Sequence, residues 1–322
     1  MTRNVVTGGA GFIGSHLTEF LLGCGEEVVV WDDLSTGSMK NLEACMGKPG
    51  FTYVISDFIS DPSFDNAVRD ADCVHHLAAA VGVELILRSP VRTIETNIRG
   101  CERALSVASR YGKRFLLTST SEVYGKTSSV PFSEEDDVTY GPTSKHRWSY
   151  GISKAVDEFL LLAYCDSPAL PGVVARLFNT VGPRQVPYYG MVLPRFIQQA
   201  KRGGPLTVHG TGTQSRCFAH VSDVVRALHA LMHTDAARGQ VVNIGSDEEI
   251  SILALAKSIV ARINPSAEIR FIPYEEAFEP GFEDLERRVP NLEKARSLIG
   301  FAPSKSLDTI IDDILEHQRH SP

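Results

Sequence analysis

Short runs of consecutive hydrophobic residues alternate, along the first half of the chain, with longer stretches in which apolar positions recur at helical spacing. The short runs are rich in valine and leucine and predict strands. They are Asn4–Thr7, Glu27–Trp31, Thr52–Ser56, Cys73–Ala78, Arg114–Ser119 and Gly172–Leu177. Strands that are apolar on both faces are typical of a parallel sheet covered by helices on both sides. We therefore expect an α/β fold with a doubly wound parallel sheet.

The regular alternation weakens after about residue 179, where Gly-Pro and Gly-Gly pairs separate shorter segments. The rest of the chain predicts helices at His220–His233, Ser251–Ile263 and Asp308–His317 and a strand at Ile269–Pro273. We expect a sheet domain at residues 1–178 with a returning segment at about 218–240. A smaller substrate-binding lobe is expected at about 179–217 and 241–322.

Composition and charge narrow the class of protein. The chain has 322 residues, of which 43% are hydrophobic and 22% charged, as in ordinary folded proteins. Its 39 acidic residues exceed its 32 basic residues, so a nucleic-acid-binding surface is disfavoured. No hydrophobic run approaches the roughly 18 to 20 residues that cross a bilayer, and the first residues leave no room for a signal peptide. We expect a cytoplasmic protein that binds neither nucleic acid nor membrane.

The spacing of cysteine and histidine gives no sign of a metal site. The six cysteines include no Cys-x-x-Cys pair, and we expect reduced thiols. The ten histidines include the neighbours His75 and His76 but no His-Glu-x-x-His grouping. No metal is therefore predicted.

A glycine-rich turn follows the first predicted strand. It reads TGGAGFIG from Thr7 to Gly14. Glycines at this spacing allow a tight turn and let the backbone approach a pyrophosphate at a helix N-terminus. The predicted cofactor-binding residues of the turn are Gly8, Gly11, Phe12, Ile13 and Gly14. Asp32, at the end of the second strand, is placed to bind the adenosine ribose and would repel a 2′-phosphate, so NAD is favoured over NADP. The alternative is that Asp32 or Asp33 only caps a loop.

A second motif carries catalytic potential. Tyr150 and Lys154 are spaced one helical turn apart, so the ammonium can stabilise the phenolate and the phenol can act as a base. The fifth strand runs into the polar segment Thr118–Gly125, at the carboxyl edge of the sheet, where ligands of such folds bind. We therefore expect the active site at this edge.

The glycine turn, Tyr150, Lys154 and the segments Thr120–Gly125 and Arg176–Arg184 together give the chain a family resemblance. Over essentially its whole length, it resembles the extended short-chain dehydrogenase/reductases that act on nucleotide sugars. The resemblance implies a Rossmann domain that binds NAD. It also implies a reaction through a transient 4-keto sugar.

The same resemblance implies roles for single residues. Tyr150 would take the proton of the sugar hydroxyl, Lys154 would hold the nicotinamide ribose and lower the pKa of Tyr150, and Thr120 would hydrogen-bond the reacting hydroxyl. The further cofactor-binding residues would be Asp57 beside the adenine, Leu77, Ala78 and Ala79 beside the pyrophosphate, and Asn97. The substrate-binding residues would be Ser121, Asn179, Arg184, Arg216 and Arg288.

Within this family, Thr120-Ser121-Glu122 and the segments Lys145–Tyr150, Gln214–Phe218 and Phe282–Pro290 resemble UDP-glucuronate decarboxylases. Simple 4-epimerases need no carboxylate at the position of Glu122. At this position thymidine-type 4,6-dehydratases have Thr-Asp-Glu, whereas GDP-mannose dehydratases share Thr-Ser-Glu with this chain. Residues 78–83, in contrast, resemble those of epimerases. A decarboxylase is the first interpretation, a UDP-glucose or UDP-glucuronate 4-epimerase is the alternative, and a 4,6-dehydratase follows.

The decarboxylase interpretation gives catalytic roles to Glu122, Ser121 and Arg288. Ser121 and Arg288 would meet the substrate carboxylate, and they are the only candidates that the motif positions offer. A guanidinium binds a carboxylate through two hydrogen bonds and can stabilise the enolate left by decarboxylation. The alternative for Arg288 is a surface ion pair with Glu283 or Asp284.

Two other classes of protein are disfavoured by the sequence. A non-catalytic NAD-binding sensor is disfavoured because both Tyr150 and Lys154 are present, and an NADP-linked reductase is opposed by Asp32. Finally, the resemblance implies a homodimer that pairs the helices near Thr96–Tyr111 and Ser149–Ala163 from two subunits.

Overall fold

The computed structural model describes residues 1–80, 89–127, 129–166, 170–187, 191–277 and 285–320. Its largest element is a seven-stranded parallel sheet with strand order β11-β6-β5-β4-β1-β2-β3. The strands are β1 (Arg3–Thr7), β2 (Glu27–Asp32), β3 (Phe51–Ile55), β4 (Cys73–His76), β5 (Arg114–Thr120), β6 (Gly172–Leu177) and β11 (Val241–Ile244). The predicted doubly wound parallel sheet is confirmed.

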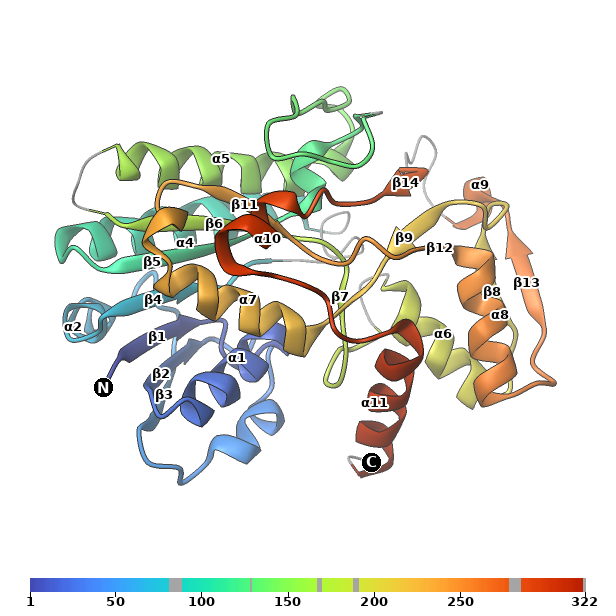
Figure 1. Cartoon of the computed structure of the whole chain (residues 1–322), viewed down its shortest axis with the longest axis horizontal. Coiled ribbons are helices and arrows are strands. Elements are labelled where there is room, and N and C mark those ends of the chain that lie inside the picture. Colours follow the sequence, from blue (N-terminus) through green and yellow to red (C-terminus); the bar gives the residue numbers. More distant parts are fainter. Residues whose placement is uncertain (81–88, 128, 167–169, 188–190, 278–284, 321–322) are drawn as a thin grey trace.

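Helices cover both faces of this sheet (Figure 1). One face carries α1 (Phe12–Gly23), α7 (Val221–His233) and α10 (Glu293–Ile299), and the other carries α2 (Ser63–Arg69), α4 (Pro90–Arg110) and α5 (Ser149–Cys165). Neighbouring residues of β1 pack against different helix layers, because successive side chains of a strand point to opposite faces. Val6 packs in the core with α1 and α7, and Val5 packs in the core with α4 and α5. This is the reason that the strands are apolar at consecutive positions.

The sheet domain contains more of the C-terminal part of the chain than we expected. We placed the end of the returning segment at about residue 240, but β11 pairs with β6, with Val241 opposite Val174. The returning segment therefore extends to Ile244. Leu292 and Ala295, at the start of α10, are buried in the same core as α1 and α7, so a second stretch also returns.

A smaller lobe lies beside the sheet domain and occupies the right of Figure 1. Its elements are α6 (Val192–Lys201), β8 (Leu206–His209), α8 (Ile252–Ile263), β13 (Ile269–Ile272), α9 (Tyr274–Ala277) and α11 (Leu307–His320). A separate core of leucine, isoleucine and valine side chains joins α6, α8 and α11. Two small sheets connect the lobes: β9 (Ser215–Cys217) lies between β12 (Glu249–Ser251) and β14 (Arg287–Arg288), and β7 (Thr180–Val181) pairs with β10 (Ala219–His220).

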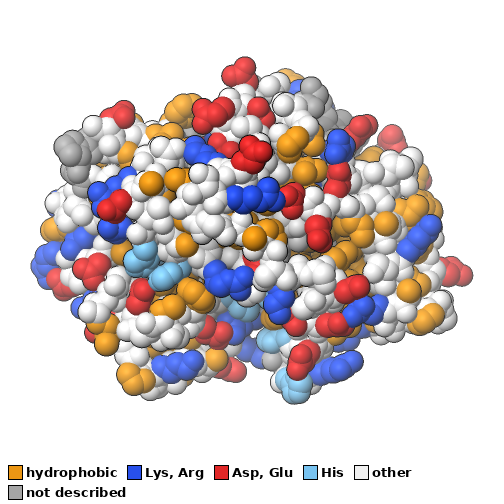
Figure 2. Space-filling model, in the orientation of Figure 1, with side chains coloured by type: hydrophobic (Ala, Val, Ile, Leu, Met, Phe, Trp, Pro, Cys, Tyr) orange, Lys and Arg blue, Asp and Glu red, His pale blue; other side chains and the backbone are white. Residues whose placement is uncertain are grey.

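The surface carries charges of both signs. Figure 2 shows acidic and basic side chains intermingled over the face in view, with no single basic region on it. Among the helices of the described residues, none combines the length and the apolar character that a membrane-spanning segment needs.

Candidate active site

A cavity of about 1370 Å³ runs along the carboxyl edge of the large sheet, between the two lobes. The ends of β1, β2, β4 and β5 line it on one side, and α6, β9 and β14 line it on the other. Ligands of open α/β sheets bind at this edge. A site for one small molecule usually measures roughly 300–1,000 Å³, so this cavity can hold a cofactor together with a substrate.

The glycine turn forms one end of the cavity and leaves no room for side chains. Gly8 has φ of 72°, and a Cβ atom there would lie 2.7 Å from the backbone nitrogen of Ala78. A Cβ atom on Gly14 would lie 2.1 Å from the carbonyl oxygen of Gly8. Because α1 begins at Phe12, its first amide groups are available to a pyrophosphate at this point. The arrangement fits a dinucleotide.

Asp32 lies at the end of β2 and lines the same cavity. Its two carboxylate oxygens accept hydrogen bonds from the amides of Ala10, at 2.9 Å, and Leu34, at 2.8 Å. These bonds hold the carboxylate in place beside the glycine turn. Each oxygen can accept a further hydrogen bond from a ribose hydroxyl, so Asp32 both caps the loop and remains available to the cofactor.

The other predicted cofactor-binding residues fall into two groups. Asp57, Leu77, Ala78 and Ala79 line the cavity. Asn97 is not among the lining residues. Its side chain accepts a hydrogen bond from the amide of Ala80 at 2.8 Å and donates one to Ser153 at 3.1 Å, so it ties the strand-four loop to α5.

Tyr150, in the first turn of α5, lines the cavity, and Thr120 hydrogen-bonds its phenol. Lys154 lies one turn further along, is buried, and does not line the cavity. Burial raises the pKa of Tyr150 to about 12, although Lys154 and Thr120 act in the opposite direction. Lys154 therefore moderates the pKa of Tyr150 without bringing it below the usual value.

Asp157 is the partner that keeps Lys154 charged. Its carboxylate lies 2.8 Å from the ammonium, and both side chains are almost completely buried. Burial favours a neutral lysine, but Asp157, together with Cys101 and Tyr150, outweighs burial and raises the pKa of Lys154. We did not assign a role to Asp157 from the sequence, although it stands three residues after Lys154 on the same helix face.

Glu122 lies at the centre of a second cluster, in the short 3₁₀ helix η2 (Ser121–Tyr124) that follows β5. Arg147, in the 3₁₀ helix η3 (His146–Trp148), donates to one oxygen of Glu122 at 2.6 Å. Arg288, in β14, approaches the other oxygen at 2.6 Å. Burial alone would raise the pKa of Glu122, but Arg288 and Arg147 lower it to about 2.

The cluster of Glu122, Arg147 and Arg288 lies at the wall that also holds Tyr150 and Ser121. Arg288 is 7% exposed, so the alternative of a surface ion pair is wrong. Glu283 and Asp284, which that alternative would have required, lie outside the described residues. The Nε atom of Arg288 is buried and has no hydrogen-bond partner among the described residues.

Arg147 is the functional candidate that we missed. It stands within a segment used for the family resemblance, but its partner Glu122 lies 25 residues away on another element. No local spacing connects the two. The statement that Ser121 and Arg288 are the only groups available to a substrate carboxylate is therefore corrected to include Arg147.

The remaining predicted substrate-binding residues also line the cavity. Asn179 donates to the carbonyl of Cys217 at 3.0 Å. Arg216 donates to its own strand at the carbonyl of Ser215, at 2.7 Å. Arg184 pairs with Glu19 of α1 at 2.5 Å, which ties the wall of the cavity to the glycine-turn helix.

Comparison with known proteins identifies the family. The model of the NAD dependent epimerase/dehydratase family matches residues 4–245. A UDP-N-acetyl-alpha-D-glucosaminuronate decarboxylase of Bacillus cytotoxicus is 39% identical over 98% of this chain and 97% of its own. The UDP-glucuronic acid decarboxylase 1 of Xenopus tropicalis is 36% identical over 98% of this chain and 72% of its own.

Solved structures share the whole architecture. A UDP-glucuronic acid 4-epimerase from Bacillus cereus, in complex with UDP-glucuronic acid and NAD, is 28% identical with a TM-score of 0.88 and covers 99% of both chains. A UDP-glucose 4-epimerase from Thermotoga maritima, with UDP-glucose, is 28% identical with a TM-score of 0.89 and 99% coverage of both chains. The chain therefore belongs to the NAD-dependent epimerase/dehydratase family and is an NAD-dependent enzyme that modifies nucleotide sugars.

Proposed function

We propose that the chain decarboxylates a UDP-hexuronate, with UDP-glucuronate as its substrate. The observation that carries this proposal is the pair of buried arginines, Arg147 and Arg288, on either side of Glu122 and on the same cavity wall as Tyr150. Arg288 also has a buried Nε atom without a hydrogen-bond partner among the described residues, so it can donate to a further carboxylate, and a uronate supplies one.

Tyr150 and Thr120 prepare the first step. Thr120 holds the phenol oxygen of Tyr150, and the sugar C4 hydroxyl binds between them. The phenolate form of Tyr150 takes the proton of this hydroxyl and becomes a phenol. The glycine turn and Asp32 would hold NAD, which would supply the hydride acceptor for C4 and the reductant for the last step. Asp157 keeps Lys154 protonated, so a positive charge next to Tyr150 stabilises the phenolate that accepts this proton.

The arginines serve the second step. Oxidation at C4 makes the sugar a β-keto acid. The bond between C5 and the carboxylate then breaks, carbon dioxide leaves, and the electron pair moves to the C4 oxygen as an enolate. Arg288 and Arg147 hold the departing carboxylate, and the buried Nε of Arg288 can donate to it. C5 takes up a proton from water in place of the carboxylate. Reduction of the C4 ketone then reverses the first step, and Tyr150 gives its proton back to the C4 oxygen, which leaves a UDP-pentose.

The names of the relatives support the same reaction, since proteins 36% to 39% identical to this chain are named as decarboxylases of UDP-uronates. The 4-epimerase alternative is supported by the structural similarity to the Bacillus cereus enzyme with UDP-glucuronic acid. In that case the arginines would hold the carboxylate while the 4-keto sugar rotates and presents its other face.

Incubation with UDP-glucuronate, UDP-N-acetylglucosaminuronate and UDP-glucose separates these functions. Mass spectrometry detects the loss of carbon dioxide, and proton NMR detects inversion at C4. We expect a UDP-pentose from UDP-glucuronate. A product of unchanged mass with inverted C4 would refute decarboxylation and leave the epimerase.

A further inference from the structure

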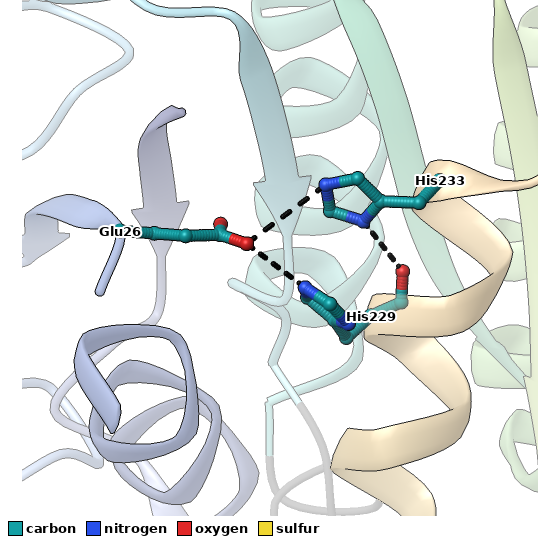
Figure 3. Close-up of side chains that lie close together, drawn as sticks. All are labelled: Glu26, His229 and His233. Atoms are coloured by element: carbon teal, nitrogen blue, oxygen red, sulfur yellow. Dashed lines mark hydrogen bonds and ion pairs between the residues drawn. The ribbon is translucent and has the colours of Figure 1, made fainter. Parts of the chain in front are cut away.

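Three potential metal ligands meet far from the cavity, at the amino edge of the sheet. Glu26 directly precedes β2, and His229 and His233 lie one helical turn apart in α7 (Figure 3). At the other end of β2, Asp32 lines the cavity. Six strand residues span roughly 20 Å, so the three side chains take no part in sugar chemistry.

The ligand atoms are close enough to share one ion. The Nε2 atom of His229 lies 2.9 Å from Oε1 of Glu26, the Nε2 atom of His233 lies 3.9 Å from the same oxygen, and all three ligand atoms lie within 4.8 Å of one another. In a tetrahedral zinc site with bonds of about 2.0–2.2 Å, ligand atoms stand roughly 3.3 Å apart. The two observed distances to Glu26 fall on either side of that value.

Neighbouring groups orient the ligands. Asn4 donates to Oε2 of Glu26 at 2.7 Å, which directs Oε1 toward the histidines. The Nδ1 atom of His233 hydrogen-bonds the carbonyl of His229 at 2.9 Å, so neutral His233 presents the lone pair of Nε2 to Glu26 (Figure 3). The ring of Phe20 packs edge-on against His229, with centroids 5.4 Å apart. Such outer contacts are typical of metal-binding histidines and carboxylates.

We propose that Glu26, His229 and His233 bind a divalent transition-metal ion, with Zn²⁺ as the preferred ion and water completing the tetrahedron. Two imidazoles and one carboxylate suit Zn²⁺ and not Mg²⁺, which prefers oxygen ligands. The ion clamps α7 to the start of β2 and stabilises the sheet domain. No metal is predicted from the sequence, because Glu26 stands 203 residues before His229 and no local motif joins the ligands.

Calorimetric titration of the tag-free, chelator-treated full chain with Zn²⁺ tests the proposal. We expect one ion per chain and a melting temperature that rises with Zn²⁺ concentration. His233→Gln and Glu26→Gln should each weaken binding by about 100-fold or more, because loss of an outer contact alone costs roughly 10–100-fold. Co²⁺ in the wild type should give the intense visible absorption of a tetrahedral site, and excess Mg²⁺ should leave it unchanged.

His320→Gln is the matched control. His320 makes the same ring contact with the carbonyl of Glu316, four residues earlier on a helix, but belongs to no group of three metal ligands in the described part of the chain. This variant should bind Zn²⁺ as the wild type does, and all variants should keep normal turnover. No uptake by the wild type, or equal uptake by all variants, would overturn the proposal.

Discussion

Replacement of Arg288 by methionine tests the carboxylate site most directly. Methionine keeps much of the volume of the stem but removes the guanidinium, which lies 2.6 Å from Glu122. The proposed substrate carboxylate would then face Glu122 with only Arg147 in compensation.

The structure sets the size of the effect. Burial raises the pKa of Glu122, and Arg288 and Arg147 outweigh burial, so that the net shift is from 4.5 to about 2. At 1.36 kcal/mol per pKa unit, this is about 3 kcal/mol. A hydrogen bond to a charged group contributes about 1.5 to 3 kcal/mol, which corresponds to a roughly 10- to 150-fold change in kcat/KM. Since the arginine also acts in the transition state, we expect a loss of about 100-fold or more in carbon dioxide release.

The assay measures carbon dioxide release from UDP-glucuronate and the affinity for UDP. Arg287→Met is the matched control, because Arg287 is the neighbouring residue of β14 but is 56% exposed and pairs with Glu249 at 2.7 Å. UDP affinity should stay within a few-fold in both variants. Arg288→Lys keeps the positive charge but loses the bidentate hydrogen bonding of the guanidinium, and it should give an intermediate rate.

Two results would refute this reasoning. Retention of more than about a tenth of the wild-type kcat/KM by Arg288→Met would place carboxylate recognition elsewhere. An equal loss in Arg287→Met would mean that β14 has been disturbed as a whole and that the charge of Arg288 is not the cause.

Four further predictions follow from the same geometry. Tyr150→Phe should abolish nearly all turnover while UDP-sugar affinity changes only a few-fold, and a residual rate above about a tenth would place the base elsewhere. NAD should bind more tightly than NADP because of Asp32, as calorimetry can measure, and equal affinities would contradict that role. Light scattering should give a dimer mass, because Val91 of α4 and Phe159 of α5 are 68% and 71% exposed; a monomer at micromolar concentration would contradict it. Burial lowers the pKa of His75 and His76 from 6.5 to about 3, so between these values only the unfolded chain binds the protons, and the folded state loses stability as the pH falls from 6.5 toward 3. The free energy of unfolding, measured with denaturant, should be lower at pH 4.5 than at pH 7 by up to about 2–3 kcal/mol per histidine. His76→Gln should reduce this loss.

The fold could be predicted because its signals are local. Strands such as Val28–Trp31 are apolar on both faces since helices cover both, and the glycine turn and the spacing of Tyr150 and Lys154 each lie within a few residues. β11 was placed outside the sheet domain because its four residues carry no signal that distinguishes one lobe from the other.

The electrostatic contacts of the site were harder to predict. Asp157 could have been found, because an acid three residues after a buried lysine lies on the same helix face. The pairing of Arg147 and Arg288 with Glu122 could not, because it joins three elements whose arrangement depends on the tertiary fold. The zinc ligands that we propose share this difficulty.

The late return of the chain has a consequence for synthesis and for fragments. Leu292, Ala295 and Phe301 are buried against the core beneath α1 and α7, and the segment that the family model matches ends at residue 245. A ribosome must therefore release the chain beyond Phe301 before this face of the sheet is covered. Until then, apolar side chains of the nascent domain stay exposed to chaperones or to aggregation. A fragment cut after residue 245 keeps every strand of the large sheet and still lacks part of its own core.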